Sequence, residues 1–429
     1  MKLKTVEKLI TSKLFKSAGI YTLTSVINSA IPFLLLPILT RYLSPTDYGI
    51  VSMFGLLVSF IAPFTGLSVH GAIARMYYEK DTIDIKEYIT NCIYILISST
   101  LLVSIVFFLF SNVIASISSV PSQILWMVVV VSFSQFITRI VLILWQVQVK
   151  PIQYGIFQIS QTLLNMLLSI ILVVFIGLTW KGRVYAQLIT LIIFVLIGFS
   201  ILLKNKWLKF NINKTYIKHA LGYGVPLIPH ALGAIVMTMT DRIFITNMVG
   251  IETTGVYTVG YQIGMIIDLL ATSFNQAYVP WLYSKLKENI PEMKFKIVRL
   301  TYLYFVIILF LAISLSIIAP SFLNIFIGKE FNQSSIYVTW IAIGYAFHGM
   351  YFMVVNFIFY VNKNYLLTLV TFLSAVLNII LNYILIGRYG AIGAAQATTI
   401  VYGVQFLSVW FLSNKTYRMP WFSGLINKK

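Results

Sequence analysis

A small set of ionisable side chains lies inside long apolar runs of the sequence. They are Asp268, His230 and His348 near the middle of such runs, Arg139 about two turns from the end of another, and the adjacent Asp241 and Arg242. A charge at the centre of a bilayer costs at least about 2.5 to 3.5 kcal/mol, so we expect these groups to face a polar cavity or one another. Arginine binds phosphate oxygens through two parallel hydrogen bonds, and a carboxylate inside a membrane can take up and release a proton.

Each of these residues also has a structural interpretation. Arg139 can extend its long side chain to the lipid headgroups, and Asp241 and Arg242 can occupy a structural position near the membrane interface. The two histidines can be packing residues with satisfied ring nitrogens. Asp268 is the strongest functional candidate, because it is an acid near the middle of its run.

Polar side chains recur at helical spacing in three of the apolar runs. These are Ser132, Gln135, Arg139 and Gln146 in the first, Gln158, Gln161 and Asn165 in the second, and Thr371, Ser374, Asn378 and Asn382 in the third. Steps of three, four or seven residues place each set on one helix face. Such side chains can instead form hydrogen bonds between helices, which contribute about 0.6 to 2 kcal/mol each. Their presence in both halves of the chain favours a hydrated central cavity.

The composition requires a membrane for most of the chain. Of the 429 residues, 59% are hydrophobic and 10% are charged, and the mean hydropathy is +0.89. A soluble domain carries roughly 25% charged residues. A transmembrane helix needs about 20 apolar residues. The sequence predicts an all-α polytopic membrane protein with twelve such helices, at about 17–40, 50–74, 89–110, 123–147, 154–177, 184–203, 220–246, 255–282, 299–320, 335–360, 366–386 and 391–413.

The basic residues predict the orientation of these helices. Of the 31 Lys and Arg residues, 24 fall on one side of the predicted membrane and five on the other. The positive-inside rule then places both termini in the cytoplasm, which an even number of spans allows. We therefore expect a multi-pass protein of the inner (plasma) membrane.

Two halves of six helices each are predicted, around the central cavity. The boundaries are a cytoplasmic leader at 1–16, a bundle at 17–203, a basic cytoplasmic linker at 204–219, a second bundle at 220–413 and a cytoplasmic tail at 414–429. The first helix of each half carries a proline pair, Pro32 and Pro37 in one and Pro226 and Pro229 in the other. Interrupted helices at matching positions indicate a transporter's central site. Ordinary kinks are the alternative, because membrane helices tolerate proline.

Several kinds of chemistry lack their motifs. Cys92 is the single cysteine, which excludes an internal disulfide and a cysteine-based metal cluster. We find no GxxxxGK[ST] phosphate loop, no HExxH, no GxSxG and no carboxylate cluster with metal-ligand spacing. We therefore expect no cofactor, no resident metal, no nucleic-acid partner and no catalytic activity. The energy for transport is expected to come from an ion gradient or from the substrate.

Two segments resemble a known family. LTRYLSPTDYGIVSMF at 39–54 is similar to the LxRxLxPxxYG junction between the first two helices of the Wzx-type polysaccharide flippases, members of the multidrug/oligosaccharidyl-lipid/polysaccharide exporter superfamily. TDRIFITNMVGIETTGVYTVGYQI at 240–263 resembles the matching junction in the second half, with its Asp-Arg pair. The chain length and the predicted twelve helices fit the same family.

The resemblance implies a V-shaped pair of bundles that alternates between inward-open and outward-open states. Its substrate would be an undecaprenyl-pyrophosphate-linked oligosaccharide, an O-antigen or capsule repeat unit, and its partners membrane lipid, a polysaccharide polymerase and a chain-length regulator. Arginines would hold the pyrophosphate and acidic residues would couple transport to protons or sodium. The candidate substrate contacts are Arg139, Arg242, His230, His348, Gln135 and Asn378, and the candidate coupling residues are Asp241 and Asp268.

Two alternatives remain open from the sequence. A drug or toxin exporter of the same superfamily would use a cavity carboxylate for a cationic substrate, and Asp241 keeps that possibility. A membrane polysaccharide polymerase or glycosyltransferase would need a large outer loop or an interfacial carboxylate motif, and the predicted outer connections are short.

Overall fold

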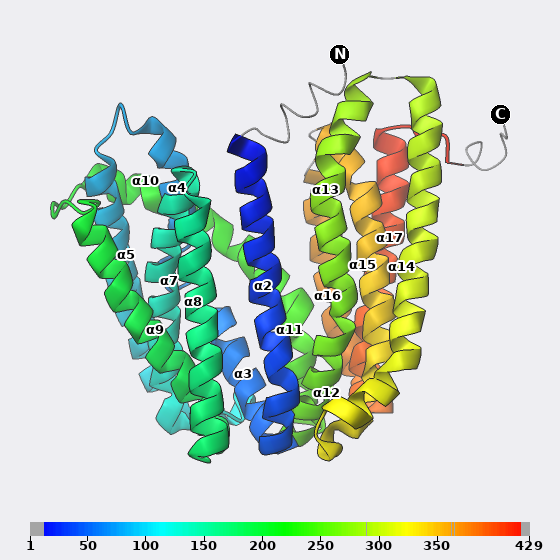
Figure 1. Ribbon diagram of the computed structural model, residues 1–429, viewed down its shortest axis with the longest axis horizontal. Coiled ribbons are helices and arrows are strands. Elements are labelled where there is room, and N and C mark those ends of the chain that lie inside the picture. Colours follow the sequence, from blue (N-terminus) through cyan, green and yellow to red (C-terminus); the bar gives the residue numbers. More distant parts are fainter. Residues whose placement is uncertain (1–12, 289, 362, 364, 422–429) are drawn as a thin grey trace. The chain divides into compact units, whose positions relative to one another are not determined.

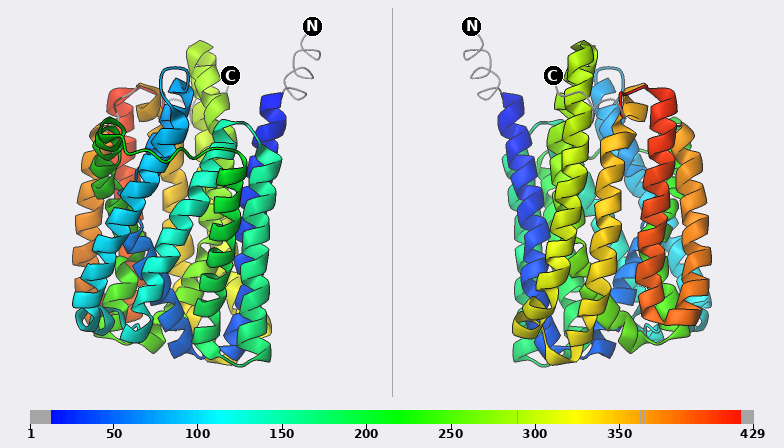
Figure 2. Two further views of the ribbon diagram at one scale, coloured as in Figure 1. Left: turned by 90° about the vertical axis from the view of Figure 1, so that its left-hand side faces the viewer. Right: turned by 90° about the vertical axis from the view of Figure 1, so that its right-hand side faces the viewer.

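The computed structural model describes residues 13–288, 290–361, 363 and 365–421, and every regular element in these ranges is a helix (Figure 1). The all-α prediction is thus confirmed. The chain divides into two compact units, Met1–Ile235 and Val236–Lys429, and α11 (Ile228–Met248) crosses from one to the other. Within each unit the long helices run side by side (Figures 1 and 2).

Unit 1 is built around one central helix, α7. Its helices are α2 (Lys13–Tyr42), α3 (Pro45–Ile61), α4 (His70–Met76), α5 (Ile85–Leu109), α6 (Ser111–Ser118), α7 (Leu125–Val147), α8 (Pro151–Ile170), α9 (Thr179–Lys204) and α10 (Lys214–Gly224). A π-helical turn, Ile171–Phe175, extends α8. Helix α7 contacts α3, α4, α5, α8 and α9. Large apolar side chains such as Leu102 and Phe108 are instead exposed on the outside of α5, as lipid contact requires.

Local sequence signals explain where several of these helices begin. Ser44 accepts a hydrogen bond from the Asp47 backbone and Asp47 accepts one from the Ser44 backbone, each at 3.1 Å, directly before the chain turns into α3 at Pro45. This reciprocal cap satisfies two backbone N–H groups that no helical partner reaches. Asp84 and Asn213 cap α5 and α10 in the simpler way, each by accepting from two backbone N–H groups.

The second predicted span, 50–74, is not one helix, which corrects the prediction. Helix α3 ends at Ile61 and α4 begins at His70, with Gly66, Leu67 and Ser68 all at positive φ between them. The Gly66 N–H donates to Ser99 Oγ at 2.8 Å, and a Cβ at Gly66 would lie 2.2 Å from the Phe136 ring. Only glycine fits this contact, and hydropathy does not report it.

The proline pairs also act differently from the prediction. Pro32 and Pro37 lie inside the continuous helix α2, so the predicted interruption of the first helix is wrong. In the second half the interruption is present, because α10 ends at Gly224, a 3-10 turn spans Val225–Leu227 with Pro226 at its start, and α11 follows. A membrane helix can therefore continue through a proline. A break requires other groups that form hydrogen bonds with the freed backbone atoms.

Unit 2 is built around α15. It holds the second part of α11 together with α12 (Ile251–Gly264), α13 (Ile266–Glu288), α14 (Pro291–Phe326), α15 (Ser335–Tyr360), α16 (Tyr365–Tyr389) and α17 (Ala391–Thr416). Helix α15 contacts α12, α13, α14 and α17. A Cβ at Gly260 would lie 2.4 Å from the Ser334 carbonyl oxygen, so a small residue is needed for this close approach.

Ten helical segments in the described residues are long and apolar enough to cross a membrane. They coincide with ten of the twelve predicted spans. The other two predicted spans are divided into shorter helices, 50–74 at residues 62–69 and 255–282 at Met265 between α12 and α13. The segment Lys214–Met237 counts among the ten although it includes the 3-10 turn Val225–Leu227. The chain is therefore a multi-pass membrane protein, whereas its orientation stays a prediction.

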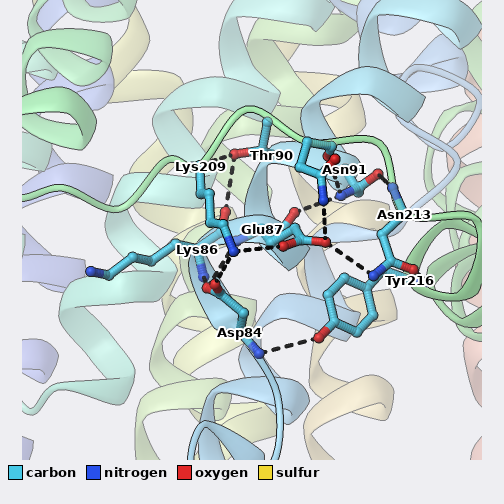
Figure 3. A network of polar contacts seen from close by, with 9 residues as sticks. Asp84, Lys86, Glu87, Thr90, Asn91, Lys209, Asn213 and Tyr216 are labelled. Carbon is cyan, nitrogen blue, oxygen red and sulfur yellow. Dashed lines mark hydrogen bonds and ion pairs between the residues drawn. The ribbon is translucent and has the colours of Figure 1, made fainter.

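The basic segment 205–213 is bound to the start of α5 (Figure 3). Lys209 Nζ lies 2.9 Å from Asp84 Oδ2 and 3.0 Å from Glu87 Oε2. The Asn211 and Asn213 side-chain amides both donate to Glu87 Oε1 at 3.0 Å. The segment predicted as a linker between the halves thus packs onto unit 1 and positions α10.

Candidate functional site

A polar cleft of about 560 Å³ lies within unit 1, between α4, α7 and α8. Its lining residues are His70, Gln135, Thr138, Arg139, Leu142, Ile143, Gln146, Tyr154 and Gln158. The structure thus brings Gln135, Arg139 and Gln146 of the stripe in the fourth predicted span together with Gln158, the first residue of the stripe in the fifth, whereas Ser132 is buried outside the cleft. Periodicity predicted the shared faces, but the cleft also depends on His70, which the break in the second span places there.

Arg139 is an exposed cation in this cleft. Its Nη1 lies 3.4 Å from His70 Nε2, at the long end of hydrogen-bond distances, and it forms no ion pair within the described residues. Two buried polar atoms of the cleft, His70 Nδ1 and Gln158 Oε1, lack a hydrogen-bond partner in the same part of the chain. Buried polar atoms are nearly always partnered, so the two atoms indicate a polar ligand. The Gln158 oxygen needs a donor such as a hydroxyl group, whereas the neighbouring Arg139 favours an anionic group on the same ligand.

Asp241 and Arg242 form a buried pair in unit 2. Asp241 Oδ1 accepts from the Arg242 backbone N–H at 2.7 Å and lies 3.7 Å from Arg242 Nη1. Tyr257 donates to Asp241 Oδ2 at 2.5 Å, and the Arg242 guanidinium lies 4.3 Å from the centre of the Tyr261 ring. Arg242 is therefore paired and covered here, unlike Arg139.

Asp268 and His348 meet although they are far apart in the sequence. Asp268 lies in the first turn of α13, and its Oδ1 is 2.8 Å from Nδ1 of His348 in α15. The two side chains are 27% and 23% exposed, so water can reach the pair. His348 stacks on Tyr402 at a centroid distance of 4.9 Å.

Tyrosines connect the two acids of unit 2, and the sequence analysis did not find them. From Asp241 the contacts run through Tyr257 to Tyr261, whose hydroxyl is 2.6 Å from that of Tyr345. Tyr345 packs on Tyr402, 5.6 Å between centroids, and Tyr402 packs on His348. Two signals were available in the sequence, because Tyr257 and Tyr261 are four residues apart and Tyr345 precedes His348 by three.

Two predicted substrate contacts lie elsewhere in the structure. Asn378 is buried, and its side-chain and backbone oxygens accept from Asn382 Nδ2 at 3.0 and 2.9 Å. His230 is exposed on the part of α11 that belongs to unit 1. Their contact with a substrate stays a prediction.

Arg183 is a polar residue near the start of α9 that binds a neighbouring helix. Counted as part of an outer loop, it lies inside α9 and donates to Asn165 Oδ1 at 2.8 Å and Ser169 Oγ at 3.2 Å. The far end of the stripe in α8 thus binds a neighbouring helix.

Comparison with known proteins gives a consistent family. Residues 14–286 match the model of the family described as "Polysaccharide biosynthesis protein". The chain is 27% identical to an uncharacterized membrane protein of Haemophilus influenzae, over 91% of this chain and 92% of that one. It is 22% identical to the capsular polysaccharide biosynthesis protein CapF of Staphylococcus aureus, over 92% and 97%.

Solved structures show the fold. A multidrug resistance MATE transporter of the MOP superfamily in an inward-facing conformation matches with a TM-score of 0.74 at 14% identity, over 90% of this chain and 94% of that one. The lipid II flippase MurJ in an inward closed conformation matches with a TM-score of 0.73 at 15% identity, over 95% and 90%. The fold of this chain is thus that of the helical transporters of this group.

Proposed function

The chain belongs to the family of polysaccharide biosynthesis proteins, and on that premise we propose that it is a flippase for a lipid-linked oligosaccharide. Its substrate is an undecaprenyl-pyrophosphate-linked repeat unit of O-antigen or capsule, carried from the cytoplasmic to the outer leaflet of the inner membrane by ion-coupled alternating access. The relative CapF is a capsular polysaccharide biosynthesis protein, and MurJ, which has the same fold, is a lipid II flippase.

The observation that carries the proposal is the exposed Arg139 in the polar cleft of unit 1, which forms no ion pair with any residue that the structure describes. A pyrophosphate presents several anionic oxygens, and charge-assisted hydrogen bonds to them are about twice as strong as neutral ones. Gln135, Gln146 and Gln158 supply the amide donors and acceptors that sugar hydroxyls need. The lipid tail remains in the bilayer, where it needs no polar contact.

A cationic drug fits this cleft poorly. None of the nine described lining residues is acidic, and the one charged group among them is Arg139. The cleft therefore favours an anionic substrate over the cation that the alternative exporter would carry.

Ion coupling is assigned to unit 2. The Asp268–His348 pair is partly exposed and its net charge changes when it takes up a proton or binds a cation, whereas the Asp241 carboxylate is buried under Tyr257 and Arg242. A ligand shifts a conformational equilibrium only by binding the two states differently. We assign that role to Asp268, and to Asp241 the role of holding Arg242 until the substrate competes for it.

The proposed orientation places both termini in the cytoplasm. The ion pairs of Lys209 with Asp84 and Glu87 bring residues 84–87 and 205–213 to one end of unit 1 (Figure 3). Both segments were predicted on the same, basic side of the membrane, and their contact supports that part of the topology; the assignment of this side to the cytoplasm rests on the positive-inside rule.

The proposal is tested at Arg139 in cells whose own copy is deleted. Arg139→Ala should abolish surface polysaccharide and Arg139→Lys should restore part of it, because a lysine keeps the charge but not the paired hydrogen bonds. Arg388→Ala, which removes an exposed arginine from the end of α16, is the matched control. Normal export by a correctly inserted Arg139→Ala variant would remove the assigned role.

A further inference from the structure

Helix α10 presents two chemically different faces to two different cavities. Ile217 and Leu221, four residues apart, line an apolar groove, whereas Thr215, Lys218, His219 and Gly222 line a basic pocket. At the spacing of an α-helix, the mean directions of the two sets differ by about a third of a turn. Both cavities belong to unit 1 and neither shares a residue with the polar cleft of Arg139.

The basic pocket has a volume of about 500 Å³. Arg75, at the end of α4, faces Lys218 and His219 of α10 across it, and none of the described lining residues is acidic. Neither Arg75 nor Lys218 forms an ion pair in the part of the chain that the structure describes. Two uncompensated cations in one pocket favour an anion.

The two acids at the start of α5 are already occupied by other groups (Figure 3). Asp84 and Glu87 bind Lys209, and Glu87 also accepts from Asn211 and Asn213. Asn213 in turn caps α10 by accepting from the backbone N–H groups of Thr215 and Tyr216. The network therefore holds α10 in place and leaves the cations of the pocket for a ligand.

The apolar groove has a volume of about 660 Å³ and lies between α3, α5 and α10. Its lining follows α5 from Tyr94 to Phe107, which at 1.5 Å per residue is about 20 Å. Half of the hydrocarbon core is about 15 Å thick, so the groove spans roughly one leaflet. Leu102 and Val106 are exposed along it, so the groove is open at the surface of unit 1.

We propose that unit 1 binds one anionic phospholipid, with the phosphate between Arg75 and Lys218 and one acyl chain in the groove along α5. A free anion would not use the groove, and a zwitterionic lipid would bring its own cation to a pocket that already holds two. Basic pockets between membrane helices on the cytoplasmic side are recognised sites for anionic headgroups. This lipid is a resident of the protein and not its cargo, so the inference does not depend on the proposed transport.

The headgroup half of the proposal is tested by native mass spectrometry of the purified full-length protein. Phosphatidylglycerol should bind in preference to phosphatidylcholine, and the double variant R75Q/K218Q should weaken phosphatidylglycerol binding about 30-fold without changing phosphatidylcholine binding. The matched control K80Q/K214Q removes two exposed lysines that do not line the pocket. Equal loss in both double variants would overturn the proposal.

The chain half is tested by filling the groove. Ser98 is exposed and lines the groove, so Ser98→Trp fills it without touching the core, whereas Ile97→Trp places the same side chain on the neighbouring exposed position outside it. Ser98→Trp should remove the bound phosphatidylglycerol and Ile97→Trp should leave it. Unchanged phosphatidylglycerol binding in Ser98→Trp would refute the site. Displacement of phosphatidylglycerol by undecaprenyl phosphate at equal concentration would refute it as well, because the bound lipid would then be the carrier lipid.

Discussion

Replacing Asp268 by asparagine removes the carboxylate that binds His348 while keeping the shape of the side chain. The two atoms that meet, Asp268 Oδ1 and His348 Nδ1, are 2.8 Å apart. A hydrogen bond to a charged group contributes about 1.5 to 3 kcal/mol and a neutral one about 0.5 to 1.5 kcal/mol. The difference, about 1 to 2 kcal/mol, is an upper range here because both side chains are about a quarter exposed.

This difference sets the expected effect on transport. If the charged pair stabilises one of two conformations, its loss shifts their ratio by about 5- to 30-fold and removes the dependence of the ratio on proton or cation binding at residue 268. We expect Asp268→Asn to transport slowly and with the same rate with and without an imposed proton or sodium gradient. Asp268→Glu should recover part of the gradient dependence, since it restores the charge.

The assay measures how fast a lipid-linked oligosaccharide moves from one leaflet to the other in vesicles that contain the purified protein. The rate is measured with a pH gradient, with a sodium gradient and with neither. His348→Gln is the companion variant, because glutamine can still hydrogen-bond to Asp268 but cannot carry a proton. A gradient dependence in Asp268→Asn equal to that of the unaltered protein would refute the assignment of coupling to this pair.

Two further outcomes follow from the structure of unit 1. Gly66→Ala should destabilise the protein by about 2 to 5 kcal/mol, because the new Cβ would meet the Phe136 ring and the φ of +79° at this position is strained for alanine. The control is Gly19→Ala, where a Cβ meets no other atom within 4 Å. Equal thermal transition temperatures for the two variants would contradict this prediction. The hydrogen bond from Lys209 lowers the pKa of Asp84 below its ordinary 3.8, and the same contact raises the pKa of Lys209 above its ordinary 10.5. The attachment of residues 205–213 should therefore be strongest between about pH 4 and 10 and weaken as the pH falls through the lowered pKa or rises through the raised one. Lys209→Met should weaken it at pH 7, while the Asn211 and Asn213 contacts to Glu87 remain. Hydrogen exchange of that segment, corrected for intrinsic rates, measures it, and pH-independent protection would exclude the contact.

The helices of this chain could largely be predicted from its apolar runs, but their breaks could not. Hydropathy cannot detect the turn at Gly66, because it depends on Ser99 and Phe136 from other helices. Pro32 and Pro37 suggested a break where α2 continues, and the break at Met265 has no proline at all. Broken helices are decided by the partners that take up the freed backbone groups, and those partners are tertiary.

The candidate site likewise has one part that the sequence predicted and one part that it did not. Gln135, Arg139 and Gln146 share a helix face, so periodicity predicted that they line one surface. The pairing of Asp268 with His348 joins residues 80 positions apart, and the tyrosines between Asp241 and His348 come from three different helices. Helical spacing indicates only the pairs within one helix, Tyr257 with Tyr261 and Tyr345 with His348. A single sequence contains no signal for the contacts between helices, which arise only when the helices of unit 2 pack.

Translocation by the purified protein tests the proposed function most directly. Vesicles are prepared with an undecaprenyl-pyrophosphate-linked oligosaccharide, and a sugar-binding protein reports how much of it reaches the opposite leaflet. The unaltered protein should move it, and Arg139→Ala should move it 10- to 100-fold more slowly, in line with the loss of a charge-assisted hydrogen bond. For an undecaprenyl-linked oligosaccharide that lacks the pyrophosphate, the two proteins should be equally slow. No translocation by the unaltered protein, or equal rates of the two proteins on the pyrophosphate-linked substrate, would contradict the function proposed here.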